Sequence, residues 1–99
     1  MVKMNVHLFQ VEPVEKLKRL AAVAEGHSDQ SHHCRRILLA IYNSYDWPLE
    51  LNRLRALDDE LVEAALAVIA WSTYSELEIH EYLDDGDLMM KRYWDREHA

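Results

Sequence analysis

Apolar residues recur every three or four positions along most of the chain, which is the spacing of one face of a helix. The strongest pattern spans residues 58–73. One face holds Leu57, Leu61, Ala64, Val68 and Trp71, and a second holds Val62, Leu66, Ile69 and Thr73. A helix that is apolar on both faces is typical of a core. We therefore predict a central helix here, capped by Asp58, with both Leu61 and Leu66 buried.

Shorter helices are predicted before and after this segment. Residues 13–25 form the first, with Pro13 in its first turn and Gly26 as its stop. A second is expected over 29–45, and a single helical turn before residue 57. Ser75 and Glu78 have the spacing of a capping box that opens a fourth helix over 76–84. Gly86 would end that helix in a left-handed turn, and Asp87 would cap a last helix.

The expected fold is all-α, a compact bundle of four to five short helices around the central helix. Residues 1–12 show a weak alternation, so they are expected to form an N-terminal arm or a short strand. Residues 13–99 would then be a single helical domain. With 99 residues, 49% of them hydrophobic, and only two glycines and two prolines, the chain suits one core with short loops.

Three features of the sequence indicate the cellular compartment of the protein. Cys34 is the single cysteine, which agrees with a reducing environment. No apolar run approaches the roughly 20 residues that cross a bilayer, and no signal-peptide pattern is present at the start. We expect a cytoplasmic protein without a membrane partner.

Charge is concentrated in the second half of the chain, within a net charge of −7. Between residues 58 and 87 there is no Lys or Arg, but there are ten carboxylates: Asp58, Asp59, Glu60, Glu63, Glu76, Glu78, Glu81, Asp84, Asp85 and Asp87. A solvated acidic surface is one interpretation. The other is a site for a protein partner with a basic surface, whose association the charge would accelerate. Direct binding of nucleic acid is not expected, because phosphates require cations.

The cations could in principle form a patch of their own. They are Lys16, Lys18, Arg19, Arg35, Arg36, Arg53 and Arg55. The negative net charge argues against a nucleic-acid site. We expect these side chains to pair with the acidic half of the chain, or with a second protomer.

Two groups of metal-ligand residue types occur, and neither has good spacing. The first comprises His27, Asp29, His32, His33 and Cys34. Consecutive helix residues point about 100° apart, so the last three cannot converge on one ion. The second, His80-Glu81 with Asp84, resembles the zinc motif H-E-x-x-H but ends in Asp. We expect no metal, no cofactor and no catalytic residue.

Aromatic and methionine side chains are numerous for so small a core. A possible interface, including that of a homodimer, comprises Trp47, Met89, Met90, Tyr93 and Trp94. Burial of these side chains in the core is the alternative.

The succession Tyr42-Asn43, Trp47-Pro48-Leu49-Glu50-Leu51 and Leu57-Asp58-Asp59-Glu60-Leu61 resembles a family of small uncharacterised bacterial proteins that also occur on mobile elements. The similarity covers residues 30–95 and leaves the first 28 residues outside. It implies a mostly helical module and assigns no catalytic residue.

Small acidic proteins of mobile elements are similar in size and charge to phage anti-CRISPR inhibitors. The leading hypothesis is a non-enzymatic interaction protein that binds a basic surface, and the similarity implies inhibition of a host defence complex as its role. The alternative is a structural or regulatory homodimer.

Overall fold

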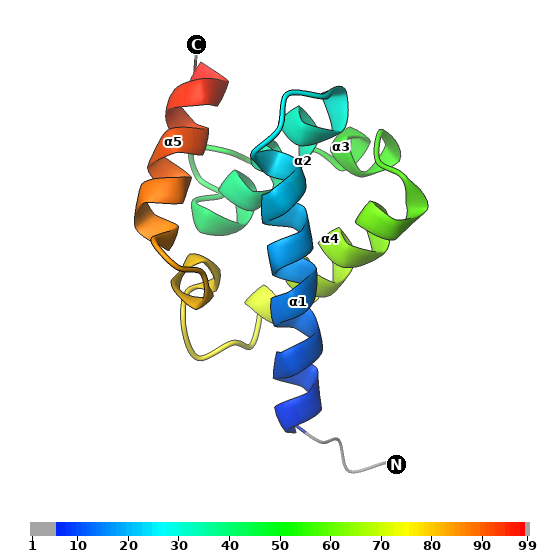
Figure 1. Cartoon of the computed structure of the whole chain (residues 1–99), viewed down its shortest axis with the longest axis vertical. Helices are drawn as coiled ribbons and strands as arrows, with labels where there is room; N and C mark the ends of the chain where they lie inside the picture. Colours follow the sequence, from blue (N-terminus) through cyan, green and yellow to red (C-terminus); the bar gives the residue numbers. More distant parts are fainter. Residues whose placement is uncertain (1–5, 99) are drawn as a thin grey trace.

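A computed structural model describes residues 6–98 of the chain, and all regular secondary structure in this part is helical (Figure 1). The elements in chain order are α1 (Val6–Ala24), α2 (Asp29–Tyr42), α3 (Leu51–Arg55), α4 (Asp59–Ser72), the 3₁₀ helix η1 (Ile79–Tyr82) and α5 (Gly86–His98). The prediction of an all-α bundle is confirmed. None of the helices described is long and apolar enough to span a membrane.

Helix α2 lies at the centre of the bundle, between α1 and α5, and it contacts every other element. Its inward side chains are fully buried, as Cys34, Ile37 and Leu39 show with exposures of 0%. The Ser28 hydroxyl caps its start by accepting a hydrogen bond from Ser31 N at 3.1 Å. The central position predicted for residues 58–73 therefore belongs to α2 rather than to α4.

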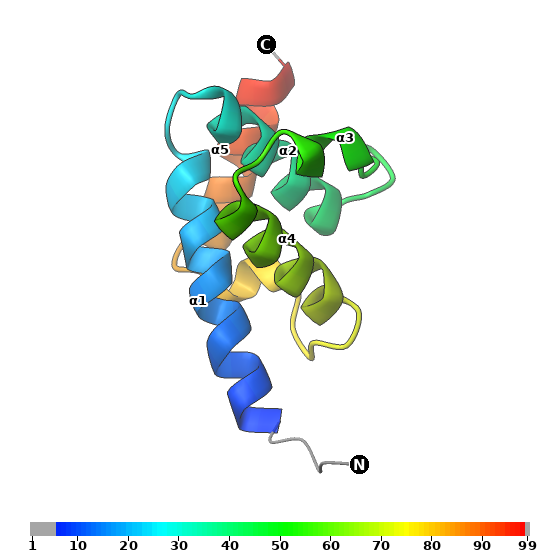
Figure 2. The same ribbon diagram turned by 90° about the vertical axis from the view of Figure 1, so that its right-hand side faces the viewer.

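Helix α4 packs mainly against α1, and it runs obliquely to α1 in Figures 1 and 2. Its first predicted face is buried, with Leu61 at 3% exposure and Val68 and Trp71 at 0%. Its second face is only partly buried, because Val62 and Ile69 pack against the core but Leu66 is 51% exposed. The prediction that Leu66 lies in the core is wrong.

Helix α1 begins at Val6, so the strand or arm expected at the N-terminus is wrong for residues 6–12, and residues 1–5 lie outside the described part. The helix continues through Pro13, which had been predicted to open it. Proline has a helical φ, but inside a helix it removes one backbone hydrogen bond and its ring crowds the carbonyl four residues earlier, so the helix continues here in spite of it. Its presence therefore did not mark the helix start.

The segment predicted as a fourth helix over 76–84 contains only the single turn η1. Ser75 does not cap it, since its hydroxyl donates to the Leu77 carbonyl at 2.8 Å. The capping box is formed instead by Glu78 and Glu81. Competition from these side-chain hydrogen bonds favours a compact turn over a regular helix.

The turn into α5 corrects a second prediction. The left-handed residue is Asp85, with a φ of 54°, and Gly86 is the first residue of α5. Gly86 is required for space, because a Cβ at this position would lie 1.9 Å from the carbonyl oxygen of His80.

Helix α2 ends at Tyr42, three residues before the predicted end at Tyr45. The Asn43 side chain accepts a hydrogen bond from Asp46 N at 3.1 Å and donates to the Asp46 carboxylate at 2.9 Å. These bonds stabilise the turn that leads to Trp47.

Candidate functional site

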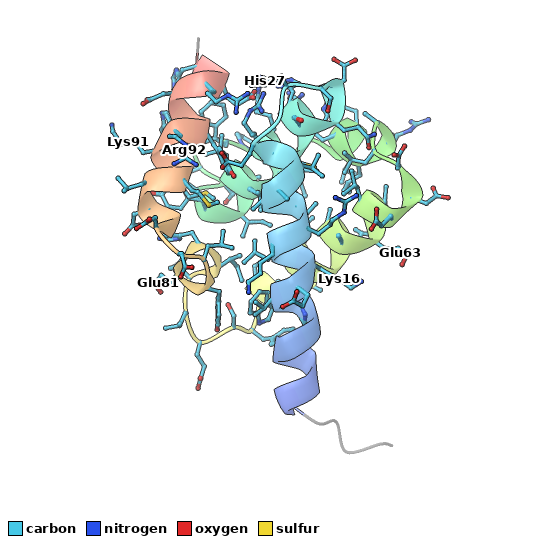
Figure 3. All side chains as sticks on the ribbon, in the orientation of Figure 1. Lys16, His27, Glu63, Glu81, Lys91 and Arg92 are labelled. Carbon is cyan, nitrogen blue, oxygen red and sulfur yellow. The ribbon has the colours of Figure 1, made fainter. Side chains whose placement is uncertain are left out.

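The ten carboxylates between residues 58 and 87 do not form one continuous surface. Four of them belong to the start of α4, here called the α4 acidic group: Asp58, Asp59, Glu60 and Glu63. Six lie around η1 and the start of α5, here called the α5 acidic group: Glu76, Glu78, Glu81, Asp84, Asp85 and Asp87. Figure 3 shows Glu63 and Glu81 on opposite sides of the molecule, with α1 between them.

In the α4 acidic group, two carboxylates are engaged in contacts within the chain. Asp58 accepts from Gln30 Nε2 at 3.0 Å, and its backbone N–H donates to Gln30 Oε1 at 2.8 Å. This pairing replaces the helix-capping hydrogen bond predicted for the Asp58 side chain, which is not formed. Glu60 pairs with Arg19 at 3.1 Å. Asp59 and Glu63 are exposed and form no ion pair with any described residue.

Three carboxylates of the α5 acidic group, Glu81, Asp85 and Asp87, line a shallow hollow of about 420 Å³ together with His80 and Gly86. His80 Nε2 contacts the Asp87 carboxylate at 2.8 Å. His80 Nδ1 is buried and has no hydrogen-bond partner among the described residues. Asp84, the third residue of the zinc-like motif, is exposed and takes no part in this pair.

Beyond the α4 acidic group, the outward face of α4 carries apolar side chains. Val62 and Ile69 are partly exposed, Leu66 is 51% exposed, and Ala70 is also exposed. These four residues recur at helical spacing and are here called the α4 stripe. Sequence analysis placed Val62, Leu66 and Ile69 on one face of the helix but assigned that face to the core.

Most of these cations pair within the chain, but only some of them pair with the acidic half, as one of the two expectations proposed. Arg19 pairs with Glu60, Lys18 with Glu15, and Arg53 with Glu50, whose Oε1 lies 2.7 Å from Arg53 Nη2. The hydrogen bond from Arg53 lowers the pKa of Glu50.

The most extensive of these contacts centres on Glu97, whose side chain is 3% exposed. It accepts from Arg35 Nε at 2.8 Å and from His32 Nδ1 at 2.7 Å, and Arg36 Nη1 lies 3.7 Å away. Burial raises the pKa of Glu97, but the hydrogen bonds from His32 and Arg35 lower it by more, so the net pKa lies below the ordinary value.

The histidines near the start of α2 are arranged around an arginine. Arg53 Nη1 lies 2.9 Å from His32 Nε2 and 3.2 Å from His33 Nδ1. Because an arginine can only donate, both ring nitrogens act as acceptors. His27 instead contacts Arg96, and Cys34 is buried. Among residues 6–98 no three His, Cys, Asp or Glu side chains are grouped so that they could hold a metal ion.

Most of the predicted aromatic interface lies inside the single chain. Tyr93 is 0% exposed, Met90 2% and Trp47 7%, while Met89 and Trp94 are partly buried. The Tyr93 hydroxyl donates to the Glu25 carboxylate at 2.7 Å. Trp47 contacts Trp94 edge to face, with ring centroids 5.4 Å apart. Interpreting Trp47, Met90 and Tyr93 as a surface is therefore wrong.

Sequence analysis missed the role of Glu97, although a signal for it was present. The buried residues of α5 are Gly86, Met90 and Tyr93, and position 97 continues their three- to four-residue spacing. A carboxylate on the buried face of a helix requires partners. The arginines of α2, which the sequence analysis had grouped as a possible patch, provide them.

Comparison with known proteins agrees with the resemblance seen in the sequence and extends it toward the N-terminus. Residues 14–98 match a family of unknown function, DUF7673, so α1 from Val14 onward is part of the family's domain rather than outside it. No curated protein and no solved structure matches the chain. Since the match spans nearly the whole chain, the protein belongs to this family of unknown function.

Proposed function

We propose that the protein is a non-enzymatic interaction protein that binds a basic surface of another protein. The observation that carries this proposal is a difference between the cationic and the anionic side chains of the protein. Arg19, Arg35 and Arg53 are tied to carboxylates within the chain. In contrast, Asp59 and Glu63 face solvent without an ion pair to any described residue.

The same contrast holds on the other side of the molecule. Glu76, Asp84 and Asp85 are exposed, and none has an ion-pair partner among residues 13–98, whose side chains the structure describes. Carboxylates left free in this way raise the association rate with a cationic partner and disfavour anionic ones. Inhibition of a host defence complex would be one use of such binding, and it stays a prediction from size and charge.

The homodimer alternative has less support. It was based on the aromatic set, and Trp47, Met90 and Tyr93 already fill the core of one chain. These side chains cannot meet a second copy without unfolding the first.

Partner capture from a lysate of the native host tests the proposal. The full chain is compared with two charge reversals, Asp59→Lys/Glu63→Lys and Glu76→Lys/Asp84→Lys, with Asp95→Lys as the control at an exposed position. We expect a protein partner whose recovery falls with added salt and with at least one double reversal, while the control retains it. A partner held equally by all variants, or capture of nucleic acid alone, would contradict the proposal.

A further inference from the structure

The α4 stripe is an apolar surface on a helix whose opposite face is already buried in the core. Leu61, Ala65 and Val68 are 0–3% exposed against the rest of the bundle. On the outward side, Leu66 and Ala70 are exposed, while Val62 and Ile69 are half-buried and keep part of their surface accessible. Figure 2 looks directly onto this helix.

Apolar exposure continues past the end of α4. Tyr74 is 53% exposed and Leu77 48% exposed, in the segment that leads to η1. Single exposed apolar residues are common on proteins, whereas a contiguous apolar patch is typical of a surface that binds another molecule.

Carboxylates lie at both ends of the stripe. Asp59 and Glu63 are exposed at its N-terminal end, and Glu76 is exposed just beyond its C-terminal end. No Lys or Arg occurs between residues 58 and 87, and Arg19 of α1, which reaches the start of α4, is paired with Glu60. An apolar centre with anionic ends is complementary to an apolar partner with cationic ends.

A second copy of this chain does not have that complementarity. In an antiparallel twofold contact, Asp59 and Glu63 of one copy would face Glu76 of the other, and in a parallel contact each carboxylate would face its own equivalent. Like charges brought together without a cation oppose association.

We propose that the α4 stripe is the docking site for an amphipathic helix of a partner protein, with Lys or Arg flanking the apolar face of that helix. This inference rests on the proposed function and specifies the partner's chemistry. A helix laid along the 14 residues of α4 matches a length of about 21 Å, at roughly 1.5 Å per residue. Its apolar side chains would recur at three- and four-residue spacing to follow the stripe.

The test uses a synthetic helical peptide as the probe, with leucines at helical spacing along one face and lysines elsewhere. A peptide of the same composition with its leucines spread over all faces is the control. Binding to the full chain is measured by titration calorimetry, and its position is mapped by changes in backbone amide resonances. The variant is Leu66→Asp, matched with Leu88→Asp, because both leucines are exposed, at 51% and 60%.

We expect the amphipathic peptide to shift α4 resonances and to bind about tenfold or more tightly than the control peptide. Leu66→Asp should weaken its binding by about tenfold, while Leu88→Asp should change it by less than about twofold. Circular dichroism of each variant verifies that the fold is retained.

Other outcomes separate this inference from the proposed function. In one such outcome, both peptides bind in a salt-dependent way, only the resonances of the α5 acidic group shift, and Leu66→Asp has no effect. That result would overturn the docking site and leave the proposed function intact. Dimerisation abolished by Leu66→Asp would overturn the inference in favour of a second copy. Failure of both peptides to bind would contradict the docking site, and failure of the lysate capture would contradict the proposed function separately.

Discussion

The carboxylate of Glu97 accepts a hydrogen bond from Arg35 Nε at 2.8 Å, across 62 positions of the sequence. The same guanidinium donates through Nη1 to the carbonyls of Ala24 and Gly26, at 2.8 and 3.1 Å. Arg35 thus joins the end of α1, the central helix and the last turn of α5. This arrangement fixes the position of α5 on the bundle.

Removal of Glu97 is expected to destabilise the protein strongly. Glu97→Ala leaves Arg35, whose side chain is 9% exposed, without its anion. Loss of one member of a buried ion pair costs about 3–5 kcal/mol. The free energy of unfolding in urea measures this. Glu97→Gln retains an acceptor oxygen and should cost less, while Asp95→Ala, at an exposed site, should change stability by less than about 0.5 kcal/mol. Equal costs for Glu97→Ala and Asp95→Ala would refute the role of Glu97.

Acid is expected to weaken the fold through His33. Burial lowers the pKa of His33, and the positive charge of Arg53 and the neighbouring His32 lower it further, against smaller opposing effects of Asp29 and Glu97. The folded state therefore binds a proton less readily than the unfolded chain, whose histidine pKa is about 6.5. Stability should be lost as the pH falls through this value toward the lower folded pKa.

The measurement is a set of urea unfolding curves between about pH 7.5 and pH 5.5, and His33→Gln is the matched variant. The wild type should lose stability over this window, and the variant should lose less. The contribution of Glu97, whose pKa is also lowered, should disappear only at more acidic pH, since its ordinary value is 4.5. A pH slope unchanged by His33→Gln would exclude His33 as its source.

Two leucines of α4 should respond differently to truncation. Leu61 is 3% exposed and Leu66 is 51% exposed. Leu61→Ala removes buried contacts and should cost about 2–5 kcal/mol, whereas Leu66→Ala should cost less than about 1 kcal/mol. Urea midpoints of the two variants provide the comparison. Comparable losses would mean that Leu66 is buried in solution, for example by a second copy.

Position 86 should accept glycine only, for a steric reason. An added Cβ would lie 1.9 Å from a backbone carbonyl of His80, which cannot rotate away. Gly86→Ala should therefore cost about 1–3 kcal/mol or more. Asp85→Gly is the informative partner, because Asp85 has the left-handed φ of 54° and glycine adopts it without strain. Thermal unfolding should show a loss for the first variant and no loss for the second.

Cys34 should resist alkylation while the protein is folded. The side chain is buried, and burial raises its pKa to about 11 from an ordinary value of 9.0. At about pH 8 this lowers the thiolate fraction roughly a hundredfold, before any steric protection. Mass spectrometry after iodoacetamide treatment, with and without guanidinium chloride, measures the ratio of rates. Similar rates in both conditions would show that the region around Cys34 opens readily.

The sequence identified most helices because their apolar spacing is local information. The first face of α4, with Leu61 and Trp71, was predicted correctly from that spacing. Spacing alone cannot say whether a second apolar face meets a neighbour. Leu66 and its surroundings were therefore assigned to the core, whereas α1 covers only one side of α4.

Long-range polar contacts were the other source of error. The pairing of Asp58 with Gln30 joins residues 28 positions apart, and capping rules applied along the sequence assigned Asp58 to its own helix. In the same way, the division of the carboxylates into two groups depends on how η1 and α4 are placed around α1. The distribution of charge along the sequence identified the acidic residues, but it could not show whether they lie on one surface.

The burial of Cys34 has a practical consequence for spectroscopy. Since it is the single cysteine in the sequence, a cysteine introduced at an exposed position would be the only thiol accessible to a maleimide reagent. Tyr45, which is 93% exposed, and Glu63, on the outside of α4, are suitable positions. A fluorophore or spin label could then report on the outward face of α4 while the native core keeps its own sulfur.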